Sequence, residues 1–66
     1  MNIILNGEAR DYPDQLSASE LLLSLGLADK RLALEVNREI VPRSAFNSHI
    51  IHPGDRVEIV HAIGGG

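Results

Sequence analysis

The chain has 66 residues, which suits one domain near the lower size limit at which a core holds a fold without disulfides or metals. Hydrophobic residues make up 44% and aromatic residues 3%, so the core is expected to be aliphatic. Cysteine is absent and the net charge is −3, which excludes disulfides, thiolate nucleophiles and side-chain persulfides and argues against nucleic-acid binding.

The charges are distributed unevenly along the sequence. The whole acidic excess lies before Arg31, where five acids face only Arg10 and Lys30, while four arginines balance four acids from Arg31 onward. The sequence shows no basic segment followed by an apolar one, which a secretion signal would need. Every apolar run is too short to span a membrane. We therefore expect a cytoplasmic protein that binds neither nucleic acid nor membrane.

The first expected element is a β-hairpin. Met1–Leu5 is an aliphatic run, and Glu8–Tyr12 mixes polar and apolar residues. Asn6-Gly7 between them is the strongest short signal for a hairpin, because a type I′ turn needs positive φ at both central positions. Pro13 is expected to end the second strand.

A helix is expected to follow the hairpin. Ser17 and Glu20 have the spacing of a capping box, and Leu16 and Leu21 occupy the positions of a hydrophobic staple. This combination predicts a helix that begins directly after Ser17.

The end of this helix is also predicted by local signals. It should run to about Leu25, with Gly26 in the left-handed conformation and Leu27 packing back on Leu22. Leu21, Leu22 and Leu25 have helical spacing and are expected to form its buried stripe.

The second half of the chain is predicted to be strand and turn. Leu32–Val36 and Glu39–Val41 are expected strands around a turn at Asn37-Arg38. Pro42 should end the second of these strands. Arg43–Ser48 is expected to be irregular or to form one helical turn.

The last strand defines the fold class. Pro53-Gly54 has the composition of a type II turn, and Arg56–Val60 should be the final strand. Ile3–Leu5 is apolar on both faces, so the first and last strands are expected to pair centrally and in parallel, connected through the helix. We predict a single α+β domain over residues 1–66, with a β-grasp (ubiquitin-like) fold: a mixed sheet of four to five strands and one helix packed across it.

The three glycines at the end are the most informative functional feature. Glycine lacks a Cβ and accepts most backbone conformations, so Gly64 and Gly65 are expected to pass through a narrow channel and present the Gly66 carboxylate as the reactive group. The alternative is a frayed terminus, which composition alone favours. We expect a flexible tail over residues 62–66.

Three residues near this tail are candidates for partner binding. Ala62 and Ile63 are apolar beside a tail expected to be free, which favours a contact with a partner. Arg43 is equally consistent with a partner contact and with a solvated surface charge.

Other features of the sequence have simpler explanations. His49, His52 and His61 are scattered and lack the spacing of a metal site, so we expect half-exposed loop and strand-end residues. Ser44 has no acid or oxyanion loop to make it a nucleophile. Asp55, after Pro53-Gly54, is expected to bond local backbone. The chain itself is therefore not expected to be an enzyme.

Several short segments, weak individually, are specific in combination because of their order in so short a chain. They are the strand ending at Asn6, the helix segment Glu20–Leu22, Val36-Asn37, Ile40–Arg43, the Gly54-Asp55 turn, Val57–Val60 and the tail His61–Gly66. Together they resemble the ThiS family, the sulfur carrier proteins of thiamine biosynthesis, over the whole chain.

The resemblance implies a reaction at the C-terminus. A ThiF-like partner enzyme would adenylate the Gly66 carboxylate, and the adenylate would be converted to a thiocarboxylate that delivers sulfur to a ThiG-like thiazole synthase. ATP and Mg²⁺ would be used by the adenylating partner, and this chain would bind no cofactor or metal. The sulfur would come from a donor such as a cysteine desulfurase or a rhodanese-type protein.

Three alternatives remain at this point. The small subunit of molybdopterin synthase is similar in its Gly-Gly end but is usually longer and has a Pro-Pro step where this chain has Val60–Ile63. A ubiquitin-like modifier would use the same end for conjugation to lysines. A plain structural domain would use it neither for sulfur transfer nor for conjugation. Gly64, where many carriers have Ala, is a minor departure from the ThiS pattern.

Overall fold

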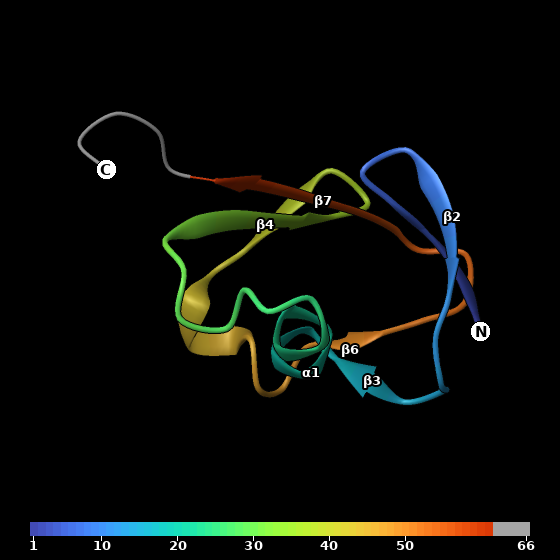
Figure 1. The fold of residues 1–66 in the computed structure, drawn as a ribbon, viewed down its shortest axis with the longest axis horizontal. Helices are drawn as coiled ribbons and strands as arrows, with labels where there is room; N and C mark the ends of the chain where they lie inside the picture. The colour runs from blue at the N-terminus through green and yellow to red at the C-terminus, as the bar shows by residue number, and fades with distance from the viewer. Residues whose placement is uncertain (62–66) are drawn as a thin grey trace.

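The computed structural model describes residues 1–61; residues 62–66, and with them the expected tail, lie outside the described residues. The elements in chain order are β1 (Asn2–Leu5), β2 (Glu8–Asp11), β3 (Leu16–Ser17), α1 (Ala18–Ser24), β4 (Leu32–Val36), β5 (Glu39–Val41), the 3₁₀ helix η1 (Arg43–Ala45), β6 (Ile50–Ile51) and β7 (Arg56–His61). They form two layers: β4 and β7 lie in one, and α1 lies in the other with β3 and β6 (Figure 1).

The predicted hairpin is confirmed. Leu5 pairs with Glu8 across the turn between β1 and β2, and φ is +48° at Asn6 and +83° at Gly7, as a type I′ turn requires. The Asn37-Arg38 turn between β4 and β5 has the same character, with φ of +53° and +70°. Arg38 is a bulky residue in a region that usually favours Gly or Asn.

The capping box at the start of α1 is present. The Glu20 N–H donates to Ser17 Oγ at 3.0 Å, and the Ser17 N–H donates to Glu20 Oε1 at 2.9 Å. Two otherwise unpaired donors of the first turn are thereby satisfied. The helix therefore begins at Ala18 as predicted.

The helix ends in a Schellman motif. Gly26 has φ of +74°; its N–H donates to the Leu23 carbonyl at 3.0 Å, and the Leu27 N–H donates to the Leu22 carbonyl at 2.8 Å. The predicted buried stripe needs one correction. Leu21 and Leu22 are buried, but Leu25, which caps the helix end, is only partly buried, and the third buried residue of the helix is Ala18 in its first turn.

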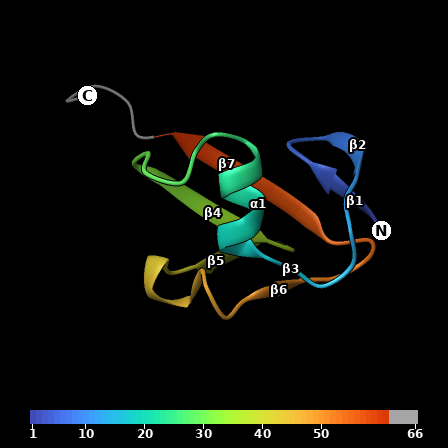
Figure 2. The ribbon, with the colours of Figure 1, turned by 60° about the horizontal axis from the view of Figure 1, so that its bottom comes forward.

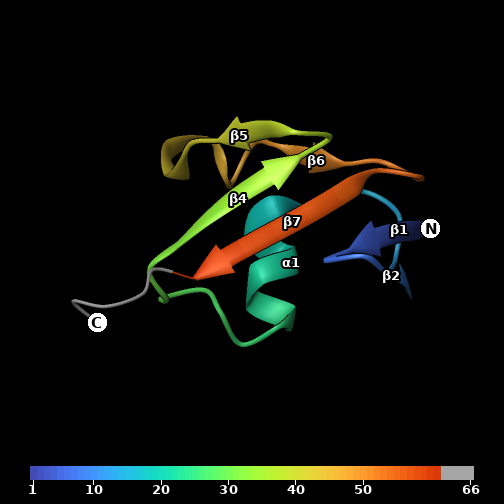
Figure 3. The same ribbon diagram turned by 90° about the horizontal axis from the view of Figure 1, so that it is seen from above.

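The main sheet has five strands in the order β2-β1-β7-β4-β5. β1 and β7 pair in parallel, and the other neighbours are antiparallel. Figure 3 shows these strands side by side with α1 beneath them. This is the predicted β-grasp arrangement, and its central strand, β7, leads to the C-terminus.

A second, two-stranded sheet was not predicted. Leu16 pairs with Ile51 and Ser17 with Ile50, which joins β3 to β6, and Figure 2 shows the two strands at the base of α1. Ser17 thus ends a strand and caps the helix at once. Two-residue strands are too short for hydrophobic periodicity to reveal them.

The core lies between the sheet and α1 and is mainly aliphatic, as expected. Its members are Ile3, Leu5, Ala18, Leu21, Leu22, Leu34, Val36, Val41, Phe46, Ile51, Val57 and Ile59. Phe46 is the aromatic residue in this core, while Tyr12 is only partly buried against it. Within residues 1–61, α1 is the longest helix with seven residues, and none is long and apolar enough to cross a membrane.

Candidate functional site

The described part of the site is β7, the strand that leads into the glycine tail. β7 pairs with β4 over five residue pairs, from Val36↔Val57 to Leu32↔His61. The pairing continues to His61, the last described residue. The tail therefore starts from a strand that is hydrogen-bonded up to its end, at the side of the molecule opposite the N-terminus (Figure 1).

An asparagine side chain extends the support of β7 on its other side. The parallel pairing with β1 reaches only Leu5↔Val57. Beyond it, the Asn6 N–H donates to the Val57 carbonyl at 2.8 Å, and Asn6 Oδ1 accepts the Ile59 N–H at 2.8 Å. Asn6 thus serves the hairpin turn through its positive φ and supports β7 through both its backbone N–H and its side chain.

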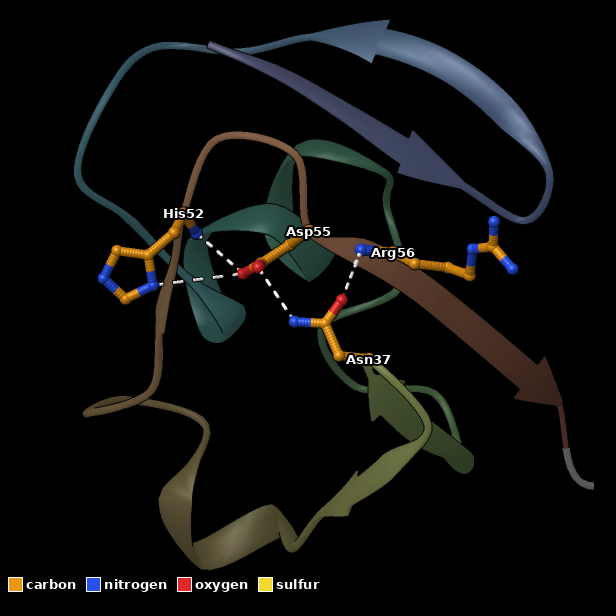
Figure 4. A network of polar contacts seen from close by, with 4 residues as sticks. All are labelled: Asn37, His52, Asp55 and Arg56. Atoms are coloured by element: carbon orange, nitrogen blue, oxygen red, sulfur yellow. Dashed lines mark hydrogen bonds and ion pairs between the residues drawn. The ribbon is translucent and has the colours of Figure 1, made fainter.

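The beginning of β7 is fixed by a second asparagine (Figure 4). Asn37 Oδ1 accepts the Arg56 N–H at 2.9 Å, and Asn37 Nδ2 donates to Asp55 Oδ1 at 3.0 Å. Asp55 Oδ2 accepts the His52 N–H at 2.8 Å. Asp55 therefore bonds local backbone, as predicted, and the network holds the Pro53-Gly54 turn to the β4–β5 hairpin.

That turn has the predicted form. The Asp55 N–H donates to the His52 carbonyl at 3.1 Å, and Gly54 has φ of +83°. A type II turn needs positive φ at its third position, which explains the glycine. The turn sets the direction in which β7 starts.

The outer face of the sheet, away from α1, carries three exposed apolar residues, two of them near the end of β7. Val60 is 56% and Ile40 72% exposed, and Ala33, also exposed, pairs with Val60 across β4 and β7. We call these three residues the outer patch. Exposed apolar residues that gather on one face indicate an interaction surface.

Sequence reasoning missed the outer patch, although one signal was available. Val57 and Ile59 point into the core, so the alternation of a strand places Val60 on the opposite face. Ile40 is brought to the same face by the pairing of β5 with β4, where it lies opposite Glu35 and diagonal to Ala33, the partner of Val60.

The predicted site residues are only partly described. Gly64, Gly65 and Gly66, together with Ala62 and Ile63, lie outside the described residues. Arg43 is exposed, and its Nη2 donates to the Lys30 carbonyl at 3.2 Å. Its guanidinium carbon lies 5.9 Å from the centroid of the Phe46 ring, a cation–π distance.

The histidines lie apart from one another. His49 is half-buried, whereas His52 and His61 are exposed. Nδ1 of His52 is 4.0 Å from Asp55 Oδ2, a contact at the limit for an ion pair. Among residues 1–61, no three histidine or carboxylate side chains group as metal ligands would.

An open cavity of about 610 Å³ lies away from the tail. It is lined by Met1, Asp14, Gln15 and the segment Ile50–Pro53, near the start of β7. β7 has six residues, so at about 3.3 Å per residue this cavity is roughly 20 Å from the strand's far end. It plays no part in the chemistry of the tail considered below.

The chain is similar to known proteins over nearly its whole length. The family model described as "ThiS family" matches residues 3–66. The sulfur carrier protein ThiS of Escherichia coli is 33% identical over 66 residues, which is all of this chain and all of that protein. A crystal structure of the thiamine biosynthesis protein ThiS from Geobacter metallireducens superposes with a TM-score of 0.88 at 33% identity, covering both chains completely.

A longer relative is also similar to this chain. A thiazole synthase of Paramagnetospirillum magneticum is 39% identical over 66 residues. All of this chain is covered, but it spans only 20% of the length of that relative. That thiazole synthase therefore contains, within one longer polypeptide, a stretch similar to this whole chain.

Proposed function

This chain belongs to the ThiS family, and on that basis we propose that it is a sulfur carrier of thiamine biosynthesis whose Gly66 carboxylate accepts and delivers the sulfur. The observation that carries the proposal is the match of the family over residues 3–66, which includes the complete glycine tail. The full-length similarity to the E. coli sulfur carrier supports it. It also favours this function over the molybdopterin synthase subunit and the protein modifier.

The chemistry needs an activated carboxylate, because a free carboxylate is inert to nucleophiles. An oxygen of the Gly66 carboxylate attacks the α-phosphorus of ATP, pyrophosphate leaves, and an acyl adenylate forms. A persulfide sulfur of the donor protein then attacks the carbonyl carbon, AMP leaves and an acyl disulfide forms. A second thiol, from a partner protein or a small-molecule reductant, attacks the donor-side sulfur of this disulfide, which releases the thiocarboxylate and leaves a disulfide between the donor and that thiol. Dividing one difficult step into two easier ones is the principle of covalent catalysis. The ATP and Mg²⁺ sites belong to the adenylating partner in this proposal.

The chain's own contribution is to carry and present the tail. We assign Gly64 and Gly65 to threading and Gly66 to the reaction, and we regard the chain as a cosubstrate of its partners in the cytoplasm. The hydrogen bonds of Asn6 and Asn37 to β7 hold the strand from which the tail departs. A tail that departs from a fixed strand starts from a fixed point on the domain.

Three partners follow from this function. One is a ThiF-like adenylating enzyme, and another is a sulfur donor such as a cysteine desulfurase or a rhodanese-type protein. The third is a ThiG-like thiazole synthase. Support for the third comes from the thiazole synthase that contains a stretch similar to this chain, since sequences joined in one polypeptide commonly act together.

Intact-mass analysis tests the proposal. The protein is incubated with ATP, Mg²⁺, an adenylating enzyme of the ThiF type and a sulfur source. The expected result is a mass increase equal to the replacement of one oxygen by sulfur, dependent on ATP and located in the C-terminal peptide. Isopeptide-linked adducts in place of this product would identify a modifier, and an unchanged mass would refute the carrier function.

Gly65→Val is expected to block adenylation. Valine is β-branched and stiff at χ1, so it widens the tail and restricts its backbone while the Gly66 carboxylate stays intact. Pyrophosphate exchange catalysed by the adenylating enzyme should fall to background. A rate equal to wild type would refute the narrow channel, and Gly65→Ala is the control that adds a Cβ with little width.

Val60→Asp is expected to weaken binding to both the adenylating enzyme and the thiazole synthase. A charge would replace an apolar contact of the outer patch. Replacement of an important interface residue costs more than about 1 kcal/mol of binding free energy, which weakens Kd roughly fivefold. Isothermal titration calorimetry with each enzyme measures the effect. Ile63→Asp, at the anchor expected from the sequence, should act in the same direction.

Leu23→Asp is the matched control for Val60→Asp. Leu23 is 69% exposed but lies on α1, on the other side of the molecule from the outer face of the sheet. Its replacement should leave both affinities unchanged. Equal losses for the two variants would show that the outer patch has no special role.

A further inference from the structure

Three cationic residues gather where β7 ends. Lys30 and Arg31 directly precede β4, and Leu32 of β4 pairs with His61, the last described residue of β7. Arg43 reaches this segment from η1 through its hydrogen bond to the Lys30 carbonyl at 3.2 Å. In Figure 1, η1 and the start of β4 lie at the same end of the molecule as the end of β7. We call Lys30, Arg31 and Arg43 the exit cluster.

Within the exit cluster, the backbone of Lys30 and the side chain of Arg43 are held in place, although all three side chains are exposed. The Lys30 N–H donates to the Leu27 carbonyl at 3.0 Å, which fixes the loop after α1. Arg43 is held by its bond to Lys30 and by its position over the Phe46 ring. A guanidinium that is held in one orientation loses less side-chain entropy when it binds a carboxylate.

The charges of the exit cluster are available to a partner. Within residues 1–61, none of its three side chains forms an ion pair, whereas at the far end Arg10 lies 3.8 Å from Glu8 and the N-terminal ammonium 3.5 Å from Asp14. The chain carries −3 in total, and the cluster carries three positive charges, so the remaining residues together carry −6. Asp29 is the acid adjacent to the cluster in sequence.

We propose that the exit cluster docks on carboxylates that border the tail channel of the adenylating enzyme. The inference rests on the proposed function, because it assumes that the tail enters such a channel. A positive patch at the base of the tail would turn this otherwise acidic protein so that the tail faces the channel. Complementary charge of this kind accelerates association more than it strengthens the final complex.

Nucleotide phosphates are the other anions at such a site, and the length of the tail argues against them. The tail from Ala62 to Gly66 has five residues and spans up to about 17 Å when extended. An extended tail therefore places the adenylated carboxylate, and the phosphates bound to it, about that distance from the exit cluster. Carboxylates at the channel mouth are within reach of the cluster, and the phosphates are not.

The test compares two double variants of equal net charge. Lys30→Gln with Arg43→Gln removes charge from the exit cluster, whereas Arg10→Gln with Arg38→Gln removes the same charge from β2 and the β4–β5 turn. Association rate constants with the adenylating enzyme are measured by stopped flow between low and physiological salt. The exit-cluster variant should associate about tenfold more slowly at low salt and show a weaker salt dependence, while the control stays within about twofold of wild type.

Further measurements separate charge from fold and from the proposed function. Arg43→Lys keeps the charge and should associate at nearly the wild-type rate, and thermal unfolding shows whether each variant is folded. Intact mass should show complete thiocarboxylation of every variant at saturating carrier concentration. Equal association rates for the two double variants, or a raised KM for ATP caused by the exit-cluster variant, would overturn this proposal alone. If the wild-type protein neither binds the adenylating enzyme nor gains sulfur, both proposals fail.

Discussion

Removal of Gly65 and Gly66 is expected to abolish thiocarboxylate formation and to leave the free energy of unfolding within about 0.5 kcal/mol of wild type. The described core runs from Ile3 to Ile59, and glycine adds no side chain to it. The reactive carboxylate, in contrast, would move back along the chain by two residues, about 7 Å. Intact mass after the complete sulfur-transfer reaction and urea denaturation measure the two expected effects.

The truncated protein separates folding from chemistry. It should still bind the adenylating enzyme through the outer patch and the exit cluster, and it should inhibit the reaction of the full-length chain. If it unfolds, the tail belongs to the folded structure; if it still gains sulfur, the reactive group lies elsewhere. Either result would contradict the assignment of Gly66.

Leu21→Ala is expected to lower the free energy of unfolding by about 2–5 kcal/mol. Leu21 is 0% exposed at the centre of the contact between α1 and the sheet. Alanine has the highest helix propensity, so the loss would come from the cavity and not from the helix. Domains of this size are stable by roughly 3–10 kcal/mol, so a large fraction of the variant should be unfolded at modest urea concentrations.

Leu23→Ala is the matched control on the same helix. Leu23 is 69% exposed, and its truncation should change stability by less than about 0.5 kcal/mol. Urea denaturation of both variants by circular dichroism measures the difference. Similar losses at the two positions would mean that α1 does not pack on the sheet through the face described above.

The proposed function requires a domain of 66 residues to meet several enzymes in sequence. β7 is central in the sheet and is supported by β4, β1 and the two asparagine side chains. Ala33 and Val60 of the outer patch and the exit cluster lie near its end, so we expect a partner to contact these surfaces when it receives the tail. We expect variants at these surfaces to change association, and variants in the tail to change chemistry.

Local sequence signals determined much of this fold. Asn6-Gly7 predicted a turn with positive φ, Ser17 and Glu20 predicted the start of α1, and Gly26 predicted its end, because each depends on hydrogen bonds within a few residues. The apolar character of both faces of Ile3–Leu5 also predicted the central parallel pair. The functional tail could be proposed from the sequence, since the lack of a side chain in glycine and the terminal carboxylate do not depend on tertiary contacts.

Only the tertiary structure decided how the remaining parts meet. Three contacts show this: the pairing of β3 with β6, the hydrogen bond between Asn6 and Ile59, and the hydrogen bond between Arg43 and Lys30. Asn6 and Ile59 are 53 positions apart in the sequence, and Arg43 and Lys30 are 13 positions apart. Such contacts depend on the packing of α1 against the sheet, and a short polar or apolar segment carries no periodic signal that would specify its distant partner. For the same reason Val60 and Ile40 came to share one face of the sheet only when β5, β4 and β7 were placed side by side.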